Sequence, residues 1–579
     1  MESSSAPTSS APASSVNGGA PTTKPPATPA TTGGGSYDAI IVGGGHNGLT
    51  TGAYLARAGL RTLILERRRI LGGACVTEEV WPGARVSRAS YVVSMLQPKV
   101  VSELELKRFG YRAHPLDPAY AAMTPDGPII FHDDVVKTQQ SIAKFSRSDA
   151  EAYGEFEELL FMAAGFVRPL MIRQPPALGS KAPADIASIL RDAGRVAGMP
   201  KRDVQQLVRI FTMSVGDWLD SLFENDYLKG SIASTGVVGV WAGPYSPGTA
   251  YNLLHHALGE LDGQVGSWGQ VIGGMGAISE AIAASARAHG AEIRTDAEVV
   301  SIDTDPAAGR VSGVTLADGT SFRAPIVASG AHPKTTILDL AGGHNFPDEV
   351  RADIEAYRTR GASVKVNMVL SEPPDYSALP GLSEEDAEHL LTAGVNYCPS
   401  LDYLERAWQD AVRGVPSANP YTELEVPSSI DSSLTDDDRW IATMFTQYGP
   451  SERERWKDGD RERYGDTCVA NMAEFAPNLP DAIVEREVLA PPDLEDIFGL
   501  QGGSIFQGEQ DIAQMAFMRP APALAQYATP LEGLYLCGAG THPGGGVMAA
   551  SGHNAAQRIL KDRRRKAGLR GRLRRRAGA

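Results

Sequence analysis

Apolar and polar positions follow two distinct patterns along this chain. Near the N-terminus, residues 37–42 include an unbroken apolar run, as a central parallel strand requires, and residues 62–65 form a second run. Between them, residues 49–58 predict a helix that Gly59 ends. Strand, helix and second strand in this order are typical of doubly wound α/β folds.

The centre of the chain changes to amphipathic helical spacing. Residues 155–167, 186–196 and 204–219 are examples, and strand patterns return at 292–303 and 311–316. At 579 residues, the chain is too long for one core. We predict a first domain assembled from discontinuous segments, and an inserted α+β substrate or cap domain. The segments are 36–110, 268–335 and 505–560 for the first domain, and 111–267 and 336–504 for the second.

The first apolar run leads into a glycine-rich loop with the spacing GxGxxG. Gly43 permits a tight turn, Gly45 leaves room for a pyrophosphate to approach the backbone, and Gly48 lets the following helix pack closely on the sheet. The helix directs its free N–H groups and positive dipole end at the phosphates. His46 and Asn47 occupy the variable positions and line the loop, without a catalytic role.

A carboxylate and a glycine doublet follow the second apolar run. Glu66 lies about 20 residues beyond the loop, where an acid binds a ribose hydroxyl. Its neighbour Arg67 is a further candidate contact. Gly72 and Gly73 bring backbone to a second surface of the cofactor, which favours FAD over NAD.

A second glycine-rich turn lies near the C-terminus. Residues 533–548 predict a strand, a turn and the start of a helix, so that backbone approaches a flavin ring and a helix N-terminus lies near flavin O2. His542 in this turn is the candidate for an acid–base or electrostatic role. Glu509 and Arg519, just upstream, are candidates for lining the same pocket.

Composition and charge narrow the function classes. With 54 basic and 69 acidic residues, the formal charge of −15 argues against nucleic-acid binding. The basic tail, residues 561–579, carries ten basic residues and one acid, which suggests contact with anionic lipid. Residues 1–35 are rich in Ser, Thr, Ala, Pro and Gly. We expect them to be disordered, and they resemble neither a mitochondrial nor a secretory address.

Four scattered cysteines indicate a reducing compartment and argue against a disulfide framework, a zinc site or a redox dithiol. The adjacent His255 and His256 face different directions on a helix, which favours structural roles over a ligand pair. We expect a cytoplasmic protein, with a peripheral membrane contact through the basic tail as a further hypothesis.

Four motifs carry a family resemblance: VGGGHNGL, LGGACVTEEVWPG, GGMGAIS and LYLCGAGTHPGGGV. From about residue 37 to 560, the chain resembles the phytoene desaturase and carotenoid isomerase branch of the FAD amine-oxidase-like superfamily. The resemblance implies a Rossmann-like FAD-binding domain and noncovalent FAD. Animal relatives of this branch are mitochondrial.

The resemblance also assigns roles to particular residues. A strand at 298–300 is expected to return beside the first strand and to contact adenine through Val299. Many flavoproteins have Gly-Asp in the C-terminal motif, whereas Gly538-Ala539 here must contact the ribityl chain through backbone. The implied FAD contacts are Gly43, Gly45, Gly48, Glu66, Gly72, Gly73, Val299, Gly538, Ala539, Gly546, Val547 and Met548.

The leading hypothesis is an FAD-dependent oxidoreductase of the dehydrogenase or desaturase type. It takes a hydride from an apolar, polyene or lipid-like substrate onto flavin N5, and passes electrons to an acceptor such as quinone or oxygen. One alternative is redox-neutral isomerisation of a polyene. Another is a flavin-binding regulatory or membrane-associated protein. An amine oxidase is less favoured, because the sequence gives no clear aromatic cage.

Overall fold

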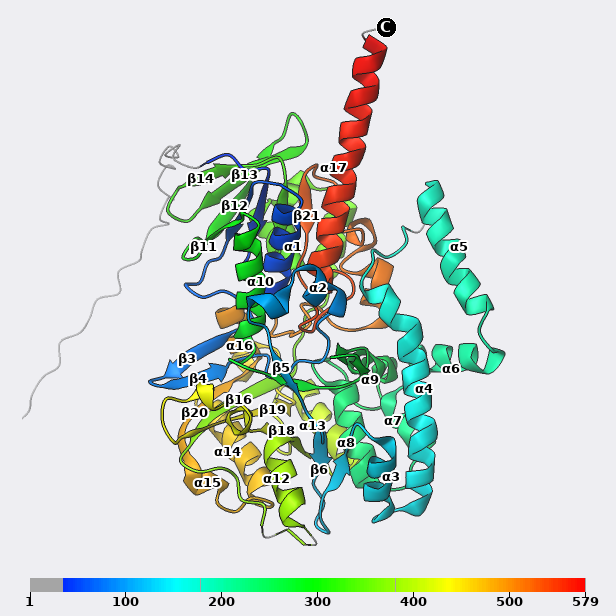
Figure 1. Cartoon of the computed structure of the whole chain (residues 1–579), viewed down its shortest axis with the longest axis vertical. Coiled ribbons are helices and arrows are strands. Elements are labelled where there is room, and N and C mark those ends of the chain that lie inside the picture. The colour runs from blue at the N-terminus through cyan, green and yellow to red at the C-terminus, as the bar shows by residue number, and fades with distance from the viewer. Residues whose placement is uncertain (1–34, 178, 378, 381, 578–579) are drawn as a thin grey trace, which may run out of the picture.

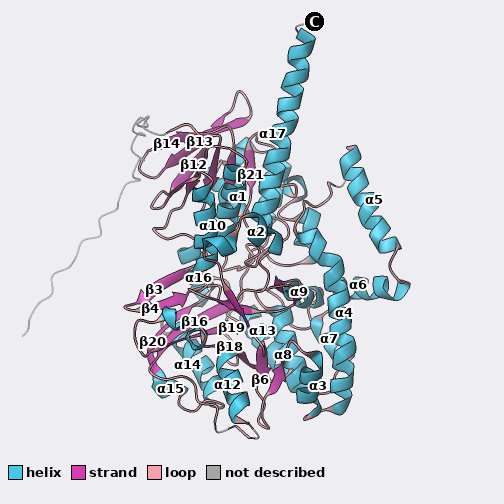
Figure 2. Cartoon of the chain, viewed as in Figure 1, coloured by secondary structure: helices cyan, strands magenta, loops and turns pink. Residues whose placement is uncertain are grey.

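The computed structural model describes residues 35–177, 179–377, 379–380 and 382–577. The predicted disordered extension, residues 1–35, lies outside this part of the chain except for its last residue. Two sheets, one above the other in Figure 1, are joined by helices and by long connecting segments. Figure 2 shows helices α3 to α9 on one side of the lower sheet, and α12, α14 and α15 at its lower end.

The upper sheet has five parallel strands, which confirms the Rossmann-like α/β fold. Its strands lie at residues within 36–110, 268–335 and 505–560, although the domain boundaries themselves stay a prediction. Gly45 precedes the crossover helix, which begins three residues earlier than predicted, at His46. In order across the sheet the strands are β11 (Glu292–Arg294), β2 (Thr62–Leu65), β1 (Ala39–Val42), β15 (Val327–Ser329) and β21 (Leu534–Leu536).

Helices cover one face of this sheet and a small antiparallel sheet covers the other. Alternate residues of β1 divide between the two sides: Ile41 packs in the cluster with the helices, and Ile40 packs in the cluster with the small sheet. The helices are α1 (His46–Arg57), α10 (Gly276–Ala288) and the first turns of α17 (Ala550–Ala577). The small sheet contains β12 (Val299–Asp305), β13 (Arg310–Leu316) and β14 (Ser321–Arg323).

The prediction that the strand at Val299 returns beside the first strand is wrong. The chain places β15 and β2 beside β1, and β12 pairs only with β13 in the small sheet. The reason is hydrophobic packing: Ile302 of β12 and Val311 and Val314 of β13 are buried in one core cluster with Ile40 and Val327 of the parallel sheet.

The lower sheet has seven strands, all paired antiparallel except β17 with β6. Along β16, Val364 and Val366 pack in a core with helix α14 (Asp460–Ala473), so the alternate Lys365 and Asn367 face the opposite side. In order the strands are β20 (Ile483–Leu489), β16 (Ser363–Leu370), β19 (Trp440–Gln447), β18 (Tyr421–Glu425), β17 (Gly394–Tyr397), β6 (Tyr120–Ala122) and β7 (Ile129–Phe131).

The predicted helical region is present, with one difference. The predicted helix at 204–219 is two helices, because the Ser214 side chain accepts a hydrogen bond from the N–H of Asp217 and starts a new helix. The helices of this region are α3 (Val135–Ala143), α4 (Arg147–Met171), α5 (Pro183–Ala197), α6 (Lys201–Thr212), α7 (Val215–Asp220), α8 (Asp226–Val237) and α9 (Thr249–His256).

The basic tail is not a separate segment. Residues 561–577 continue helix α17, which projects from the upper end of the molecule in Figure 1. Among the residues that the structure describes, no helix is long and apolar enough to cross a membrane.

Candidate functional site

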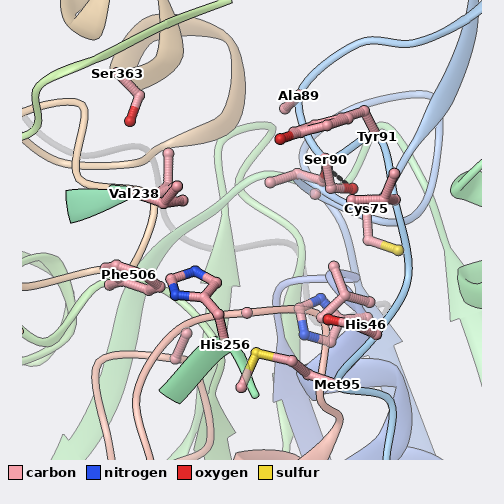
Figure 3. Close-up of a pocket in the computed structure, with 18 of the residues that line it drawn as sticks. His46, Cys75, Ala89, Ser90, Tyr91, Met95, Val238, His256, Ser363 and Phe506 are labelled. Atoms are coloured by element: carbon pink, nitrogen blue, oxygen red, sulfur yellow. Dashed lines mark hydrogen bonds between the residues drawn. The ribbon is translucent and has the colours of Figure 1, made fainter. Parts of the chain in front are cut away.

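A cavity of about 620 Å³ lies between the two sheets. Its lining comes from segments far apart in the sequence, and Figure 3 shows several of them, including His46, Tyr91, His256 and Ser363. We call the part formed by Gly43–Gly48, Glu66, Gly72 and Gly73 the cradle. The part lined by side chains of the lower sheet and the helical region is the chamber.

The three glycines of the cradle loop are constrained in three different ways. Gly43 has φ +98°, in the region that favours glycine. A Cβ on Gly48 would lie 2.1 Å from the carbonyl oxygen of Gly43, so no larger residue fits there. A Cβ on Gly45 would meet only the Gly72 carbonyl, at 3.8 Å. Gly45 therefore borders open space in the cavity, as a phosphate site requires.

Helix α1 begins directly at this loop. Gly45 is its N-cap and lacks a side-chain cap, so the first N–H groups of the helix remain available to an anion. His46 and Asn47 lie in the first turn and line the cavity. Asn47 also accepts a hydrogen bond from the N–H of Gly552 at 3.2 Å, which ties the start of α1 to α17.

Glu66 joins the pieces of the cradle. One carboxylate oxygen accepts from the N–H of Gly44 at 2.7 Å, and the other accepts from the N–H of Arg68 at 2.9 Å. The N–H of Gly72 donates to the Gly44 carbonyl at 2.9 Å, so the glycine doublet lies against the first loop. A carboxylate oxygen has two acceptor sites, and Glu66 can still accept from a ribose hydroxyl.

The C-terminal motif lines the middle of the cavity. Gly538, Ala539, Gly546 and Val547 all border it, as do Arg67 and Val299. Met548 does not: its side chain is buried in the core of the helical region, and its carbonyl accepts from the N–H of Gln97. Met548 is therefore the predicted cofactor contact that does not line the cavity.

The predicted catalytic His542 lies outside the cavity lining. Its Nε2 is 2.9 Å from the carbonyl oxygen of Leu170, and its own carbonyl accepts from the hydroxyl of Tyr527 at 2.6 Å. Burial lowers the pKa of His542 to about 4. These contacts hold the turn against α4, and they argue against the predicted acid–base role.

Glu509 and Arg519 are also outside the lining. Glu509 forms ion pairs with Arg358 and Arg360, at 3.1 and 2.7 Å. Arg519 is fully buried and donates to five backbone carbonyls, one of them that of Ala539 at 3.2 Å. Arg519 thus supports the C-terminal loop from behind rather than lining the pocket.

The chamber contains a buried polar cluster that the motifs did not predict. Lys365 donates to the hydroxyl of Thr443, and its Nζ lies 4.2 Å from the centre of the Tyr91 ring. The Tyr91 hydroxyl donates to Glu423 at 2.8 Å, and Gln270 donates to Glu425. The sequence did hold a signal for this cluster, because polar residues alternate with apolar ones along β16 and β18.

Burial shifts the titration of this cluster. Burial lowers the pKa of Lys365 to about 7. The negative charges of Glu425 and Glu423 act in the opposite direction and raise this pKa. Burial raises the pKa of Glu425 well above its ordinary value, and the charge of Glu423 adds to that rise. The chamber therefore holds an amine that can gain or lose a proton near neutral pH.

Aromatic side chains line the rest of the chamber. The rings of Tyr120 and Phe131 stack with centroids 4.2 Å apart, and Phe131 lies 6.1 Å from the ring of Tyr153. Glu157 lines this region, and burial raises its pKa to about 7. His256 also lines the cavity, with a pKa that burial lowers to about 4.

The four cysteines are buried and free. Burial raises the pKa of Cys75 and of Cys537 to about 12, and the Cys75 thiol donates to the carbonyl of Met275 at 3.2 Å. Although Cys75 lines the cavity, its thiol is held protonated and packed.

A Rossmann-like sheet, a phosphate loop open to a cavity and a second glycine-rich loop define a flavin-dependent oxidoreductase. The chain belongs to the family of flavin-containing amine oxidoreductases, whose pattern matches residues 48–560. It is 37% identical over 556 residues to pyridine nucleotide-disulfide oxidoreductase domain-containing protein 2 of Rattus norvegicus, covering 91% of this chain and 94% of the relative.

More distant relatives align over a similar length of the chain. Phytoene desaturase (lycopene-forming) of a Paracoccus species is 25% identical over 549 residues, covering 90% of this chain and 97% of the relative. The structure of cyclohexylamine oxidase from Brevibacterium oxydans aligns with a TM-score of 0.53 at 17% identity, covering 91% of this chain and 99% of the other. The last likeness concerns the fold alone.

FAD is the cofactor of this family, and the residues of the cradle fit it. The space beside Gly45, the free N–H groups of α1 and the carboxylate of Glu66 suit a pyrophosphate and a ribose. The cavity extends past the C-terminal loop into the chamber.

Proposed function

We propose that this protein is an FAD-dependent dehydrogenase for a largely apolar substrate, polyene-like or lipid-like. The observation that carries this proposal is that the cavity continues from the cradle into an aromatic chamber containing one buried amine, Lys365. When bound in the cradle, FAD would supply a two-electron acceptor for a hydride. The chain supplies orientation, exclusion of water and a proton acceptor.

Lys365 is the group that we assign to proton transfer. Removing two hydrogens from adjacent carbons releases a hydride and a proton, and the proton needs a base. Lys365 lines the cavity, and burial lowers the pKa of its amine to about 7, so that the amine can act as a base near neutral pH. Tyr91 and Thr443 fix its position.

The aromatic side chains of the chamber hold an apolar body. Stacked rings such as Tyr120 and Phe131 offer large apolar surfaces with few hydrogen-bonding groups. Because they lie beside the cavity rather than filling it, a substrate can pack against them and displace water.

Anaerobic spectroscopy tests the proposal. Holoprotein is mixed with candidate polyenes, unsaturated lipids and amines, and the flavin absorbance near 450 nm is followed. We expect an apolar compound to bleach the flavin and lose two hydrogens. If dithionite bleaches it and no apolar compound does, the apolar-substrate proposal fails.

A second candidate is the oxidation of an amine attached to an apolar body. Tyr120, Phe131 and Tyr153 line the chamber, and ring faces attract a substrate cation. Glu157, which also lines it and whose pKa burial raises to about 7, adds a negative charge above neutral pH. Matched pairs separate the two candidates: a hydrocarbon and its terminal amine of equal length. Bleaching by the amine alone, with peroxide release in air, favours this second function.

The electron acceptor and the location are further parts of the proposal. We propose quinone or oxygen as acceptor, and a cytoplasmic protein that contacts a membrane through its basic tail. Reoxidation of the bleached flavin with either acceptor, followed in a stopped-flow instrument, ranks the two acceptors directly.

A further inference from the structure

Helix α5 carries an apolar face that no other element covers. Ile186, Ile189 and Leu190, spaced for one side of a helix, are 45%, 36% and 65% exposed. None of the described residues of α5 belongs to a hydrophobic core cluster. In Figure 1 the helix stands apart from the body of the molecule.

The polar side of α5 holds it to the protein. Asp192 forms an ion pair with Arg173, and Arg195 lies over the ring of Phe166 at 5.0 Å and donates to its carbonyl. This orientation is the reverse of an ordinary surface helix, which buries its apolar face. The apolar face of α5 is therefore left on the outside of the molecule.

The neighbouring helix α6 anchors this arrangement. Leu207 and Ile210 are buried in the core of the helical region, and Phe211 packs against Tyr251 with ring centroids 4.9 Å apart. On its outer side Val208 is 59% exposed. The α5–α6 hairpin, residues 183–212, thus has one end fixed in the core and an apolar surface outside it.

Charge identifies the partner. The α5–α6 hairpin contains five basic and three acidic residues, whereas the whole chain carries −15. Helix α17, which contains most of the basic tail, projects near α5 (Figure 1), and Asp185 of α5 lines one surface pocket with Lys561 and Arg565 of α17. A positive apolar surface suits the interface of an anionic bilayer.

We propose that the α5–α6 hairpin docks on an anionic lipid bilayer, with the apolar face of α5 in the interface and α17 adding electrostatic attraction. A second copy of the chain fits less well, because two basic hairpins would face each other. At 15 residues, α5 is too short to span a bilayer and would lie in its plane.

The docking surface connects with the chamber, a step that rests on the proposed function. Phe161 lies on α4, lines the cavity and is 38% exposed, and Phe166 of the same helix supports Arg195 of α5. A docked bilayer thus lies near one exposed side chain of the chamber, and an apolar substrate has a short route from lipid to cavity.

Vesicle co-sedimentation of full-length holoprotein tests the surface. Neutral phosphatidylcholine vesicles are compared with vesicles that contain about 30% phosphatidylglycerol and so mimic an anionic leaflet. The variant is Ile186→Glu with Leu190→Glu. The matched control is Val412→Glu with Val415→Glu, at valines that are 52% and 46% exposed. Flavin absorbance and Tm verify that each variant is folded.

We expect wild type and control to bind anionic vesicles at least about tenfold better than neutral ones, and the α5 variant to lose at least about tenfold in binding. The double variant Arg563→Glu with Arg564→Glu should bind anionic vesicles more weakly, and its binding should depend less on the salt concentration. Equal binding by the α5 variant and the control overturns the proposal, as does a dimer that the α5 variant dissociates. Flavin bleaching by detergent-dispersed substrate is measured separately, so failure of docking is distinct from failure of the proposed function.

Discussion

The cradle and the chamber face the same cavity but are built in opposite ways. The cradle consists of backbone, and its key positions work because they lack side chains: Gly45 borders open space, and Gly48 permits α1 to approach the loop. The chamber depends on side chains, such as Lys365 and Tyr120, which come from several strands and helices. A binding site for an invariant cofactor needs space and N–H groups, whereas a substrate site needs particular chemical groups.

We expect the largest effect from substituting two glycines of the cradle, Gly48 and Gly45, which have different roles. Gly48→Ala places a methyl group 2.1 Å from a backbone oxygen, and we expect it to destabilise the fold by about 3 kcal/mol or more. Gly45→Thr keeps a good N-cap residue and fills open space, so the apoprotein should stay folded. Its affinity for FAD should fall by about tenfold or more.

Thermal unfolding of the Gly48→Ala and Gly45→Thr apoproteins measures their stability, and titration of Gly45→Thr with FAD measures its affinity. The account is contradicted if Gly48→Ala melts like wild type, or if Gly45→Thr binds FAD normally.

A change in the chamber should spare the cofactor and remove the chemistry. Lys365→Met keeps the length of the side chain and removes its base. We expect normal FAD binding and a flavin reduction rate about 10²- to 10⁴-fold lower. In wild type, the rate should rise with pH through about 7, as Lys365 becomes neutral.

The control for that prediction is Val412→Glu, a change at an exposed residue that does not line the cavity. Rapid-mixing kinetics across pH 6–9 (a window of roughly this width brackets the lysine pKa) measure both variants. An unchanged rate in Lys365→Met removes Lys365 from the mechanism.

Lowering the pH should destabilise the fold through one histidine in the cradle and one in the chamber. His46 in the cradle and His256 in the chamber have pKa values of about 4, because burial disfavours their charged forms. The unfolded chain binds these protons below pH about 6.5, so stability is lost as pH falls from 6.5 towards 4, by on the order of 3 kcal/mol per histidine.

The Tm of the apoprotein between pH 7 and 4 checks this dependence. The variants His46→Gln and His256→Gln should each show a shallower fall than wild type. A fall of equal steepness in both variants excludes these histidines as its source.

The smallest effect on activity is expected at His542. Because its ring bonds to the Leu170 carbonyl outside the cavity, His542→Gln should leave the flavin reduction rate within about twofold of wild type. The lost hydrogen bond should cost about 1 kcal/mol of stability. A rate loss comparable with that of Lys365→Met would restore the catalytic role predicted from sequence.

The cradle was predictable because its residues lie close together in the chain. The spacing of Gly43, Gly45 and Gly48 and the position of Glu66 encode a local turn, so short-range patterns suffice. The position of β12 was missed because strand order depends on which apolar faces pack together, and not on local sequence.

The contacts of His542 argue against its predicted role for a related reason. Proximity in sequence to the glycine-rich turn suggested proximity to the flavin, yet the side chain turns towards α4. The chamber was missed because Tyr91, Lys365 and Glu423 meet only through pairing of strands from distant segments. Alternating polar residues on buried strands were the available clue, and they do not reveal their partners.

The most direct test of the central claim is an anaerobic FAD titration of three apoproteins, followed by exposure to an apolar substrate that bleaches wild type. The account predicts a yellow, bleachable wild type, a Gly45→Thr that binds FAD at least about tenfold more weakly, and a yellow Lys365→Met that does not bleach. A folded wild type that stays colourless, or a Lys365→Met that loses FAD as Gly45→Thr does, would contradict the division of one cavity into cradle and chamber.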